Sequence, residues 1–241
     1  MDSGYYAACS ALISQTEALD TIANNLANVS TVGYRGEQNV FSSVLADAGN
    51  ASGSSLDQAM NSYGILGGTT LDLSQGALQK TGNNLDLAIE GRGYFGGQTA
   101  NGVAYTRAGD FQGSAHGQMV TSKGVAVMGD RGVISMPPGK VAISADGTIS
   151  SNGAVVGKLK VVEFAPTTHL ASIGNAYYSA PANAAMSATD SSVRQGMLES
   201  SNVNPITGMV QLVMAQRSAE MAQRALAMFN SEIDKTATQD L

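Results

Sequence analysis

The sequence predicts an α+β fold in which N- and C-terminal α-helices pack as a coiled-coil-like pair, with a central, mostly antiparallel β domain between them in the chain. Three observations indicate this fold. Apolar residues recur at alternating intervals of three and four near each end of the chain, and short segments of alternating apolar and polar residues fill the middle. The 241 residues, of which 43% are hydrophobic, suffice for a core.

The first helical segment is predicted at residues 1–35. Its seam positions follow the alternating spacing, with one polar exception: Tyr5, Ala8, Leu12, Gln15, Leu19, Ile22, Leu26 and Val29. This is the spacing of the a and d positions of a coiled coil, so it predicts a helix that packs against another helix. Gly33 supplies an end signal, because glycine readily adopts the left-handed conformation that closes many helices.

Residues 36–70 are predicted to form an extended or flexible connector, because LADAGNASGSSLDQAMNSYGILGG is rich in Gly, Ser and Ala and has weak periodicity. A central β domain is predicted at residues 71–190. Its strands are separated by turn residues, and Asp-Gly and Asn-Gly pairs favour tight hairpins. The predicted turns are Gly82-Asn83, Gly109-Asp110, Ser122-Lys123-Gly124, Asp146-Gly147 and Asn152-Gly153.

The second helical segment is predicted at residues 191–241, with a start signal at Asn204-Pro205. Its seam consists of Leu212, Ala215, Ala219, Ala222, Leu226, Phe229 and Ile233. A second stripe lies on another face at intervals of seven: Met214, Met221 and Met228. Two interpretations remain open. The helix has contacts on more than one side, or both stripes belong to a wide core-facing surface of a monomer.

Composition and charge exclude several classes of protein. The net charge is −6 and no run of Lys or Arg occurs, which disfavours nucleic-acid binding. The single Cys9 excludes an internal disulfide and is interpreted as a small packing residue. No stretch is long and apolar enough to predict insertion in a membrane. The first residues lack the basic and apolar regions of a Sec signal peptide, so we expect either a cytosolic protein or export that leaves the N-terminus intact.

The sequence predicts no catalytic site, cofactor or metal. Gly91–Gly96 matches G-x-G-x-x-G, but a turn and strand pattern follows it where a dinucleotide site needs a helix, so a glycine-rich bend is the interpretation. His116 and His169 lie in loop-like stretches without zinc-ligand spacing. Solvated or turn roles are expected for the carboxylates near the predicted strands, Asp72, Asp86 and Glu90.

Motifs along nearly the whole chain resemble those of bacterial flagellar rod and hook proteins. LDTIANNLANVSTVGYR (Leu19–Arg35) resembles their N-terminal signature, and ESSNVNPITGMVQLVMAQRSAEM (Glu199–Met221) their C-terminal one. GALQKTGNNLDLAIEGRGYF (Gly76–Phe95) and the stretches AYTRAGDF and QMVTSKGVAVMG resemble their central motifs. These motifs occur in the family's order, which disfavours a chance match.

The resemblance implies a structural subunit of the flagellar basal-body rod and not an enzyme. Such proteins pass unfolded through the flagellar type III export gate and polymerise in the periplasm, through their terminal helices, into a rod that transmits torque. The implied partners are further copies of the chain, other proximal and distal rod subunits, and the export gate. The length and the SNVNPI form resemble the proximal-rod members most, so the subtype depends on Pro205, with distal-rod members as the alternative and hook-type proteins as a more remote one.

The residues expected at assembly surfaces are Leu12, Leu19, Ile22, Asn25, Leu26, Asn28, Val29, Asn202, Leu212, Ala215, Ala219, Ala222, Leu226, Phe229 and Ile233. Phe41 and Leu45 match a family motif that the export gate reads, although both could pack locally. Asn24, Asn25 and Asn28 fall off the first seam. We hypothesise that they fix the register between subunits, because buried amides demand partners, with capping of its own helix as the alternative for Asn28.

A second class of function is a rod-like protein that also degrades cell-wall glycan. That activity would need two carboxylates at a defined separation in a cleft, and an additional module for which the chain offers no length.

Overall fold

The computed structural model describes residues 2–42, 65–137, 139–181 and 183–239. The chain divides into two compact units, each of which is assembled from separate segments. The helical unit contains Met1–Ala27, Glu37–Thr70 and Asn204–Leu241. The β unit contains Asn28–Gly36 and Leu71–Val203. The chain therefore passes from one unit to the other at four points.

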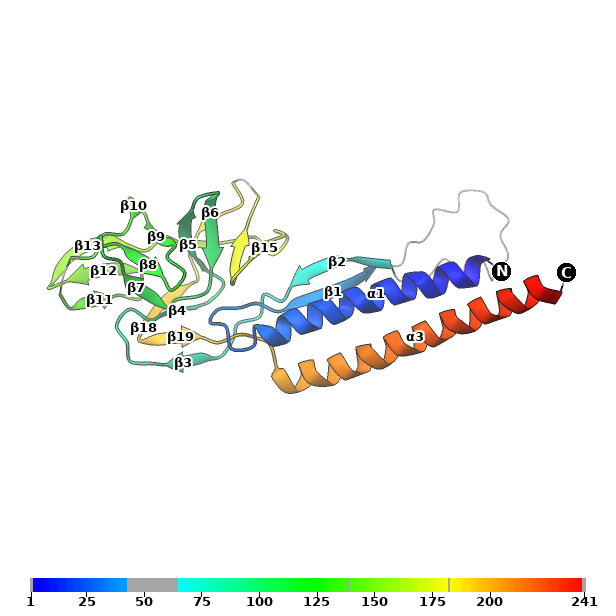
Figure 1. Ribbon diagram of the computed structural model, residues 1–241. Coiled ribbons are helices and arrows are strands. Elements are labelled where there is room, and N and C mark those ends of the chain that lie inside the picture. The colour runs from blue at the N-terminus through cyan, green and yellow to red at the C-terminus, as the bar shows by residue number, and fades with distance from the viewer. Residues whose placement is uncertain (1, 43–64, 138, 182, 240–241) are drawn as a thin grey trace. The chain divides into compact units, whose positions relative to one another are not determined.

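The helical unit is built around two long helices, α1 (Asp2–Ala27) and α3 (Pro205–Gln239). They lie side by side and run in opposite directions (Figure 1). A two-stranded sheet of β1 (Glu37–Ser42) and β2 (Ile65–Leu71) completes the unit, and β1 contacts α1. In the part of the chain that the structure describes, no helix combines the length and the apolar character needed to cross a membrane.

The predicted start of α3 is confirmed. The Asn204 side-chain oxygen accepts hydrogen bonds from the backbone N–H groups of Ile206 (3.0 Å) and Thr207 (3.2 Å), so Asn204 is an N-cap. Pro205 occupies the first helical position, where its missing N–H costs nothing. The end of α1 differs from the prediction, because the helix stops at Ala27 and Val29 lies in the turn that follows.

The β unit consists of short strands. In chain order they are β3 (Leu78–Lys80), β4 (Leu87–Glu90), β5 (Tyr94–Thr99), β6 (Gly102–Thr106), β7 (Phe111–Gly113), β8 (Met119–Thr121), β9 (Ala126–Gly129), β10 (Gly132–Val133), β11 (Val141–Ile143), β12 (Thr148–Ser151), β13 (Ala154–Lys158), β14 (Val161–Glu163), β15 (Ala171–Gly174), β16 (Tyr177–Ser179), β17 (Met186–Ser187), β18 (Ser192–Gln195) and β19 (Met197–Glu199). Every strand pair described in this unit is antiparallel.

Among the described strands, ten form one sheet whose main path is β15-β16-β6-β5-β9-β8-β7. Three predicted turns close hairpins: Ser122–Gly124 joins β8 to β9, Asp146–Gly147 joins β11 to β12, and Asn152–Gly153 joins β12 to β13. Asn152 and Gly153 both have positive φ, at 51° and 84°, as a two-residue hairpin turn requires.

The other two predicted turns do not close hairpins. The strand before Gly82, β3, pairs with β19, and the strand after it, β4, pairs with β18. Likewise β6 and β7, on either side of Gly109, are not neighbours in the sheet. For β3 and β4 the partners come from a distant part of the chain, whereas β6 pairs with β5 and β16, and β7 pairs with β8. A turn signal therefore does not by itself decide which strands pair, because register depends on the buried face as well as on the turn.

The same pairings explain where the predicted domain limits differ from the structure. The prediction placed residues 191–199 in the C-terminal helical segment, whereas the structure makes them β18 and β19 of the β unit. At the other end, β1 and β2 lie within or at the limit of the predicted connector, residues 36–70, of which 43–64 lie outside the described residues. The α+β class itself is confirmed, with terminal helices and a largely antiparallel β unit.

The core of the β unit is apolar and continuous. Its buried side chains are Leu87, Ile89, Phe95, Phe111, Met119, Val127, Ile134, Ile143, Ile149, Leu159 and Val193. A smaller aromatic cluster adjoins it, in which Tyr94 packs edge-on against Phe164 and Tyr178. The G-x-G-x-x-G stretch forms the bend between β4 and β5 at residues 91–93, with φ of 117° at Gly91, and then enters β5 at Tyr94.

Candidate functional site

The inner surface of α1 is covered on two adjacent sides, by α3 and by β1. Its buried positions are Ser14, Ala18 and Thr21, which lie beside the predicted seam and not on it. The predicted seam residues of α1 are half-buried: Leu12, Gln15, Leu19, Ile22 and Leu26. Because β1 covers one side of α1, the most buried residues of α1 are those between its contacts with β1 and with α3, and not those of the a/d stripe.

The inner surface of α3 follows the predicted seam. Ala215 and Ala219 are buried, and Leu212, Ala222 and Leu226 are half-buried. A β-carbon placed at the buried Gly208 would lie 3.9 Å from Cδ1 of Leu26, so these two helices approach closely near the start of α3. Phe229 and Ile233 belong to α3, but their side chains lie outside the described residues.

The outer surface of α3 is unusually apolar for a solvent-facing helix. Met214, Met221 and Met228 are 65%, 63% and 66% exposed, so this stripe does not face the core of the chain. The interpretation of a wide core-facing surface in a monomer is therefore wrong. Large exposed apolar stripes mark interaction sites more often than solitary exposed residues do.

A groove of about 460 Å³ lies between α1, β1 and α3. Thr21 and Asn25 of α1 border it on one side, and Met214 and Ala215 of α3 on the other.

The asparagine-rich end of α1 binds its own chain. The Asn25 side chain donates to the carbonyl oxygen of Glu37 (2.7 Å) and accepts from the N–H of Glu37 (2.8 Å). These are the two hydrogen bonds that a residue of a neighbouring β-strand would make with Glu37. One turn earlier, Thr21 donates to the side chain of Asn39 (2.9 Å). These bonds attach β1 to α1 within the chain, so the amide of Asn25 is satisfied without a second subunit, and a role in intersubunit register stays a prediction.

Asn28 follows the last residue of α1. Its backbone oxygen accepts from the N–H of Thr31 (3.0 Å) and its side-chain oxygen from the Thr31 hydroxyl (3.1 Å). Both bonds close the turn after the helix, in agreement with the alternative of local capping.

Within the β unit, three chain segments that lead to the helical unit are bonded together at a place we call the junction, comprising residues 33–36, 72–76 and 199–202. The N–H of Gly33 donates to the carbonyl oxygen of Glu199 (2.8 Å), and the N–H of Asp72 donates to that of Gly36 (2.8 Å). The N–H of Ser200 donates to Ala77 (2.9 Å). The segments are therefore held next to one another by their backbones.

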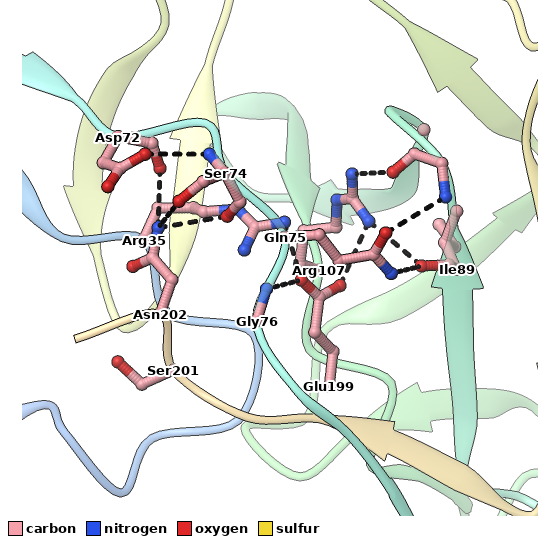
Figure 2. A network of polar contacts seen from close by, with 12 residues as sticks. Arg35, Asp72, Ser74, Gln75, Gly76, Ile89, Arg107, Glu199, Ser201 and Asn202 are labelled. Carbon is pink, nitrogen blue, oxygen red and sulfur yellow. Dashed lines mark hydrogen bonds and ion pairs between the residues drawn. The ribbon is translucent and has the colours of Figure 1, made fainter. Parts of the chain in front are cut away.

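Asn202 connects all three segments through one side chain (Figure 2). Its oxygen accepts from the N–H of Gly36 (2.8 Å), and its nitrogen donates to the carbonyl oxygens of Asp72 (2.9 Å) and Ser74 (3.1 Å). The predicted assembly residue Asn202 thus has an internal bonding role, while its role in assembly stays a prediction.

A buried ion cluster lies at the centre of the junction (Figure 2). The Glu199 carboxylate is 2.7 Å from Nη2 of Arg35 and 3.0 Å from Nη1 of Arg107, and its side chain is fully buried. It also accepts from the N–H of Gly76 (2.9 Å). The Arg35 contact is an ion pair by distance, although its angle lies outside hydrogen-bond geometry. With two guanidinium groups and one carboxylate, the buried cluster carries a net positive charge.

The two arginines are held by further contacts. Arg107 donates to the carbonyl oxygens of Ile89 (3.2 Å) and Gly91 (2.5 Å) and lies 5.0 Å from the ring centre of Tyr94. Burial lowers the pKa of the Arg107 guanidinium, and the neighbouring Glu199 opposes that shift. The backbone N–H of Arg35 donates to the Tyr178 hydroxyl (2.9 Å), whose pKa is raised by burial.

Two glycines allow the junction to close. Gly33 has φ of 67°, and a β-carbon there would lie 2.3 Å from the backbone nitrogen of Ala108. A β-carbon at Gly76 would lie 2.0 Å from the carbonyl oxygen of Ser200. Side chains at either position would therefore collide with backbone atoms.

The residues weighed as catalytic or metal-binding are not brought together. His116 and His169 are exposed, in separate loops. Within the described ranges, no group of three or more His, Cys, Asp or Glu side chains could hold a metal ion. Phe41 lies in β1 with its side chain outside the described residues, and Leu45 lies outside them entirely.

The ion cluster was missed by sequence reasoning, although its members lie in motifs that the resemblance includes. Arg35 ends the N-terminal motif, Arg107 belongs to AYTRAGDF, and Glu199 begins the C-terminal motif. Each of the three motifs contains one of these charged residues among mainly apolar or small ones, which is a sequence signal of a special role. Only the fold shows that the three charged side chains contact one another.

Comparisons with known proteins agree along the chain. The profile described as "Flagella basal body rod protein" matches residues 6–35. The profile described as "Flagellar hook protein FlgE/F/G D1 domain" matches residues 88–155, and "Flagellar basal body rod FlgEFG protein C-terminal" matches residues 194–239.

Curated relatives match nearly the full length. "Flagellar basal-body rod protein FlgF" of Mesorhizobium japonicum is 32% identical over 98% of this chain and 96% of the relative. The protein of the same name from Caulobacter vibrioides is 32% identical over 100% of this chain and 98% of the relative. "Flagellar basal-body rod protein FlgG" of Bacillus subtilis is 35% identical over 83% of this chain and 84% of the relative.

Proposed function

Because the chain belongs to the family of flagellar basal-body rod proteins, we propose that it polymerises through α1 and α3 into the periplasmic part of the flagellar drive shaft. The observation that carries the proposal is the match to FlgF proteins over almost the whole of both chains. It covers both terminal helices and the β unit, and not one module alone.

The surfaces of the helical unit support polymerisation. A rod of repeated subunits needs different patches on one subunit to meet on the next. The exposed apolar stripe of α3 supplies one such patch, because leaving it in water is unfavourable. In the rod, α1 and α3 pack in a coiled-coil-like manner against helices of neighbouring subunits, using the predicted seams and the surfaces beside them.

Export by the flagellar type III system is part of the proposal, and membership in the family supports it. Phe41 and Leu45 are the residues proposed as the signal for the export gate, on the form and position of the motif FSSVL.

The proximal-rod, FlgF-like subtype is favoured over the distal-rod, FlgG-like subtype by coverage. The FlgF relatives from Mesorhizobium japonicum and Caulobacter vibrioides align with 98% and 100% of this chain. FlgG relatives align with 83% to 92% of it, although the identity of the one from Bacillus subtilis over its part is slightly higher.

The test is to locate the protein in purified basal bodies of its native host. A gold-labelled epitope inserted after Lys123, in the exposed turn between β8 and β9, should mark the rod where its proximal part meets its distal part. Deletion of the gene should abolish swimming, and the tagged gene should restore it. A label along the distal rod would favour the FlgG-like alternative, and a label absent from the rod would refute the proposed function.

A further inference from the structure

The outer surface of α3 lies opposite the surface that α3 turns toward α1. Ile206, Val210 and Val213 are 74%, 49% and 48% exposed, and Met221 and Met228 are more than half exposed. Arg217 and Arg224 are exposed on the same side, two helical turns apart, between the apolar side chains. We call this set the outer face of α3. It combines large apolar side chains with positive charge.

The outer face of α1 has the opposite character. Glu17 and Asp20 are exposed there, next to the small side chains of Thr16, Ala23 and Ala27. Thr16, Asp20 and Ala27 lie on the side of the helix opposite the buried Ala18, and Glu17 lies at the edge of this face. No Lys or Arg occurs in the sequence before Arg35, so no cation of the helix offsets the two carboxylates.

The charges on both faces are available for a partner. Among the described residues, neither Glu17 nor Asp20 takes part in an ion pair, and neither does Arg217. Arg224 lies 3.9 Å from Glu220, but both side chains are largely exposed, and such pairs contribute little. The two faces therefore remain complementary in charge.

We propose that the outer face of α3 in one copy of this chain binds the outer face of α1 in a second copy; this inference rests on the proposed function. A single chain cannot make the contact, because both faces point away from its own α1–α3 contact. The methionines occupy the space left by the alanines of α1, and Arg217 and Arg224 pair with Glu17 and Asp20. Since each copy carries both faces, the contact repeats from copy to copy and does not close on itself.

Charge reversal tests the contact in the full-length chain. The first variant carries Arg217→Glu and Arg224→Glu, and the second carries Glu17→Lys and Asp20→Lys. Each face is then repelled by its unaltered partner face in an identical copy. A matched control carries Lys123→Glu and Lys140→Glu on exposed residues of the β unit, which changes the net charge by the same amount as the first variant does. Circular dichroism verifies that all variants keep the helix content of the wild type.

Assembly is measured by sedimentation velocity and electron microscopy over a range of protein and salt concentrations. Each reversed variant alone should need a concentration higher by about tenfold or more to assemble, and the control should match the wild type. An equimolar mixture of the two reversed variants should assemble again, because both faces of each variant then meet opposite charges in the other. Wild-type assembly should weaken as salt rises.

The outcomes separate this inference from the proposed function. If the wild type assembles and the reversed variants assemble equally well, the contact between α3 and α1 is refuted while self-assembly stands. If both variants fail and their mixture also fails, the pairing of these two faces is refuted. If the wild type stays monomeric throughout, a second copy is not the partner of this face, and the proposed self-assembly fails with it.

Discussion

Replacing Glu199 with Gln should destabilise the β unit more than any other single loss of charge in the chain. Glutamine keeps the shape of the side chain and an oxygen that accepts from the N–H of Gly76. It removes only the negative charge that lies 2.7 Å from Arg35 and 3.0 Å from Arg107. Both guanidinium groups then remain buried without an anion.

The magnitude follows from this geometry. At an effective dielectric constant of about 20, a pair of unit charges at about 4 Å attracts by about 4 kcal/mol. Breaking a buried pair by removing one partner costs about 3–5 kcal/mol, because the remaining charge stays desolvated. Unfolding temperature changes by about 2–4 °C per kcal/mol in a protein of this size, so the β unit should melt about 10 °C lower.

Thermal unfolding monitored by near-ultraviolet circular dichroism is a suitable assay. The chain has no Trp, and Tyr94 and Tyr178 lie in the aromatic cluster beside the junction. The matched control is Glu90→Gln, which removes an equally short ion pair, 2.7 Å from Arg194, between side chains that are about half exposed. Its cost should not exceed about 1 kcal/mol. If Glu199→Gln costs no more than Glu90→Gln, the ion cluster does not stabilise the junction.

Three further changes probe the same region. Asn202→Ala removes the bonds to Gly36, Asp72 and Ser74, so it should lower the free energy of unfolding by about 1–3 kcal/mol and accelerate amide exchange at Gly36. Unchanged exchange at Gly36 would contradict the role of Asn202 in holding the three segments together. Gly33→Ala should destabilise the chain by more than about 1 kcal/mol, through a strained φ and a collision with Ala108, whereas Gly124→Ala has a similarly positive φ but open space and should lose less in urea unfolding. Burial raises the pKa of Tyr178 above the usual 10, so its contribution to stability is complete below pH 10 and is lost as pH rises from there toward the folded-state pKa; Tyr178→Phe should reduce this alkaline loss, and an unchanged pH profile would count against it.

Local periodicity accounts for what the sequence predicts well. The seam of α3 was predictable because Leu212, Ala215 and Ala219 are fixed relative to one another by the helix itself. The burial of α1 was less predictable, since Ser14, Ala18 and Thr21 are covered partly by β1, whose residues carry no strong strand pattern in the predicted connector.

Contacts between distant segments account for what the sequence does not show. The amide of Asn25 evidently needed a partner, but nothing local identifies the backbone of Glu37 as that partner. The same holds for Glu199, which looks like an ordinary surface charge until the fold brings Arg35 and Arg107 to it. Antiparallel pairing of β18 with β4 and of β19 with β3 is equally nonlocal.

The junction also determines when the β unit can finish folding. Its bonds join residues far apart in sequence: Gly36 and Asn202 are separated by 166 positions, and Gly76 and Glu199 by 123. Such contacts raise the contact order, and the entropy of closing these loops must be met before the bonds form, which makes folding slow. In a chain that becomes available from its N-terminus onward, the ion pair between Arg35 and Glu199 cannot form until residue 199 has emerged. The β unit therefore cannot be complete before this segment has emerged, whereas α1 precedes it in the chain and α3 follows it.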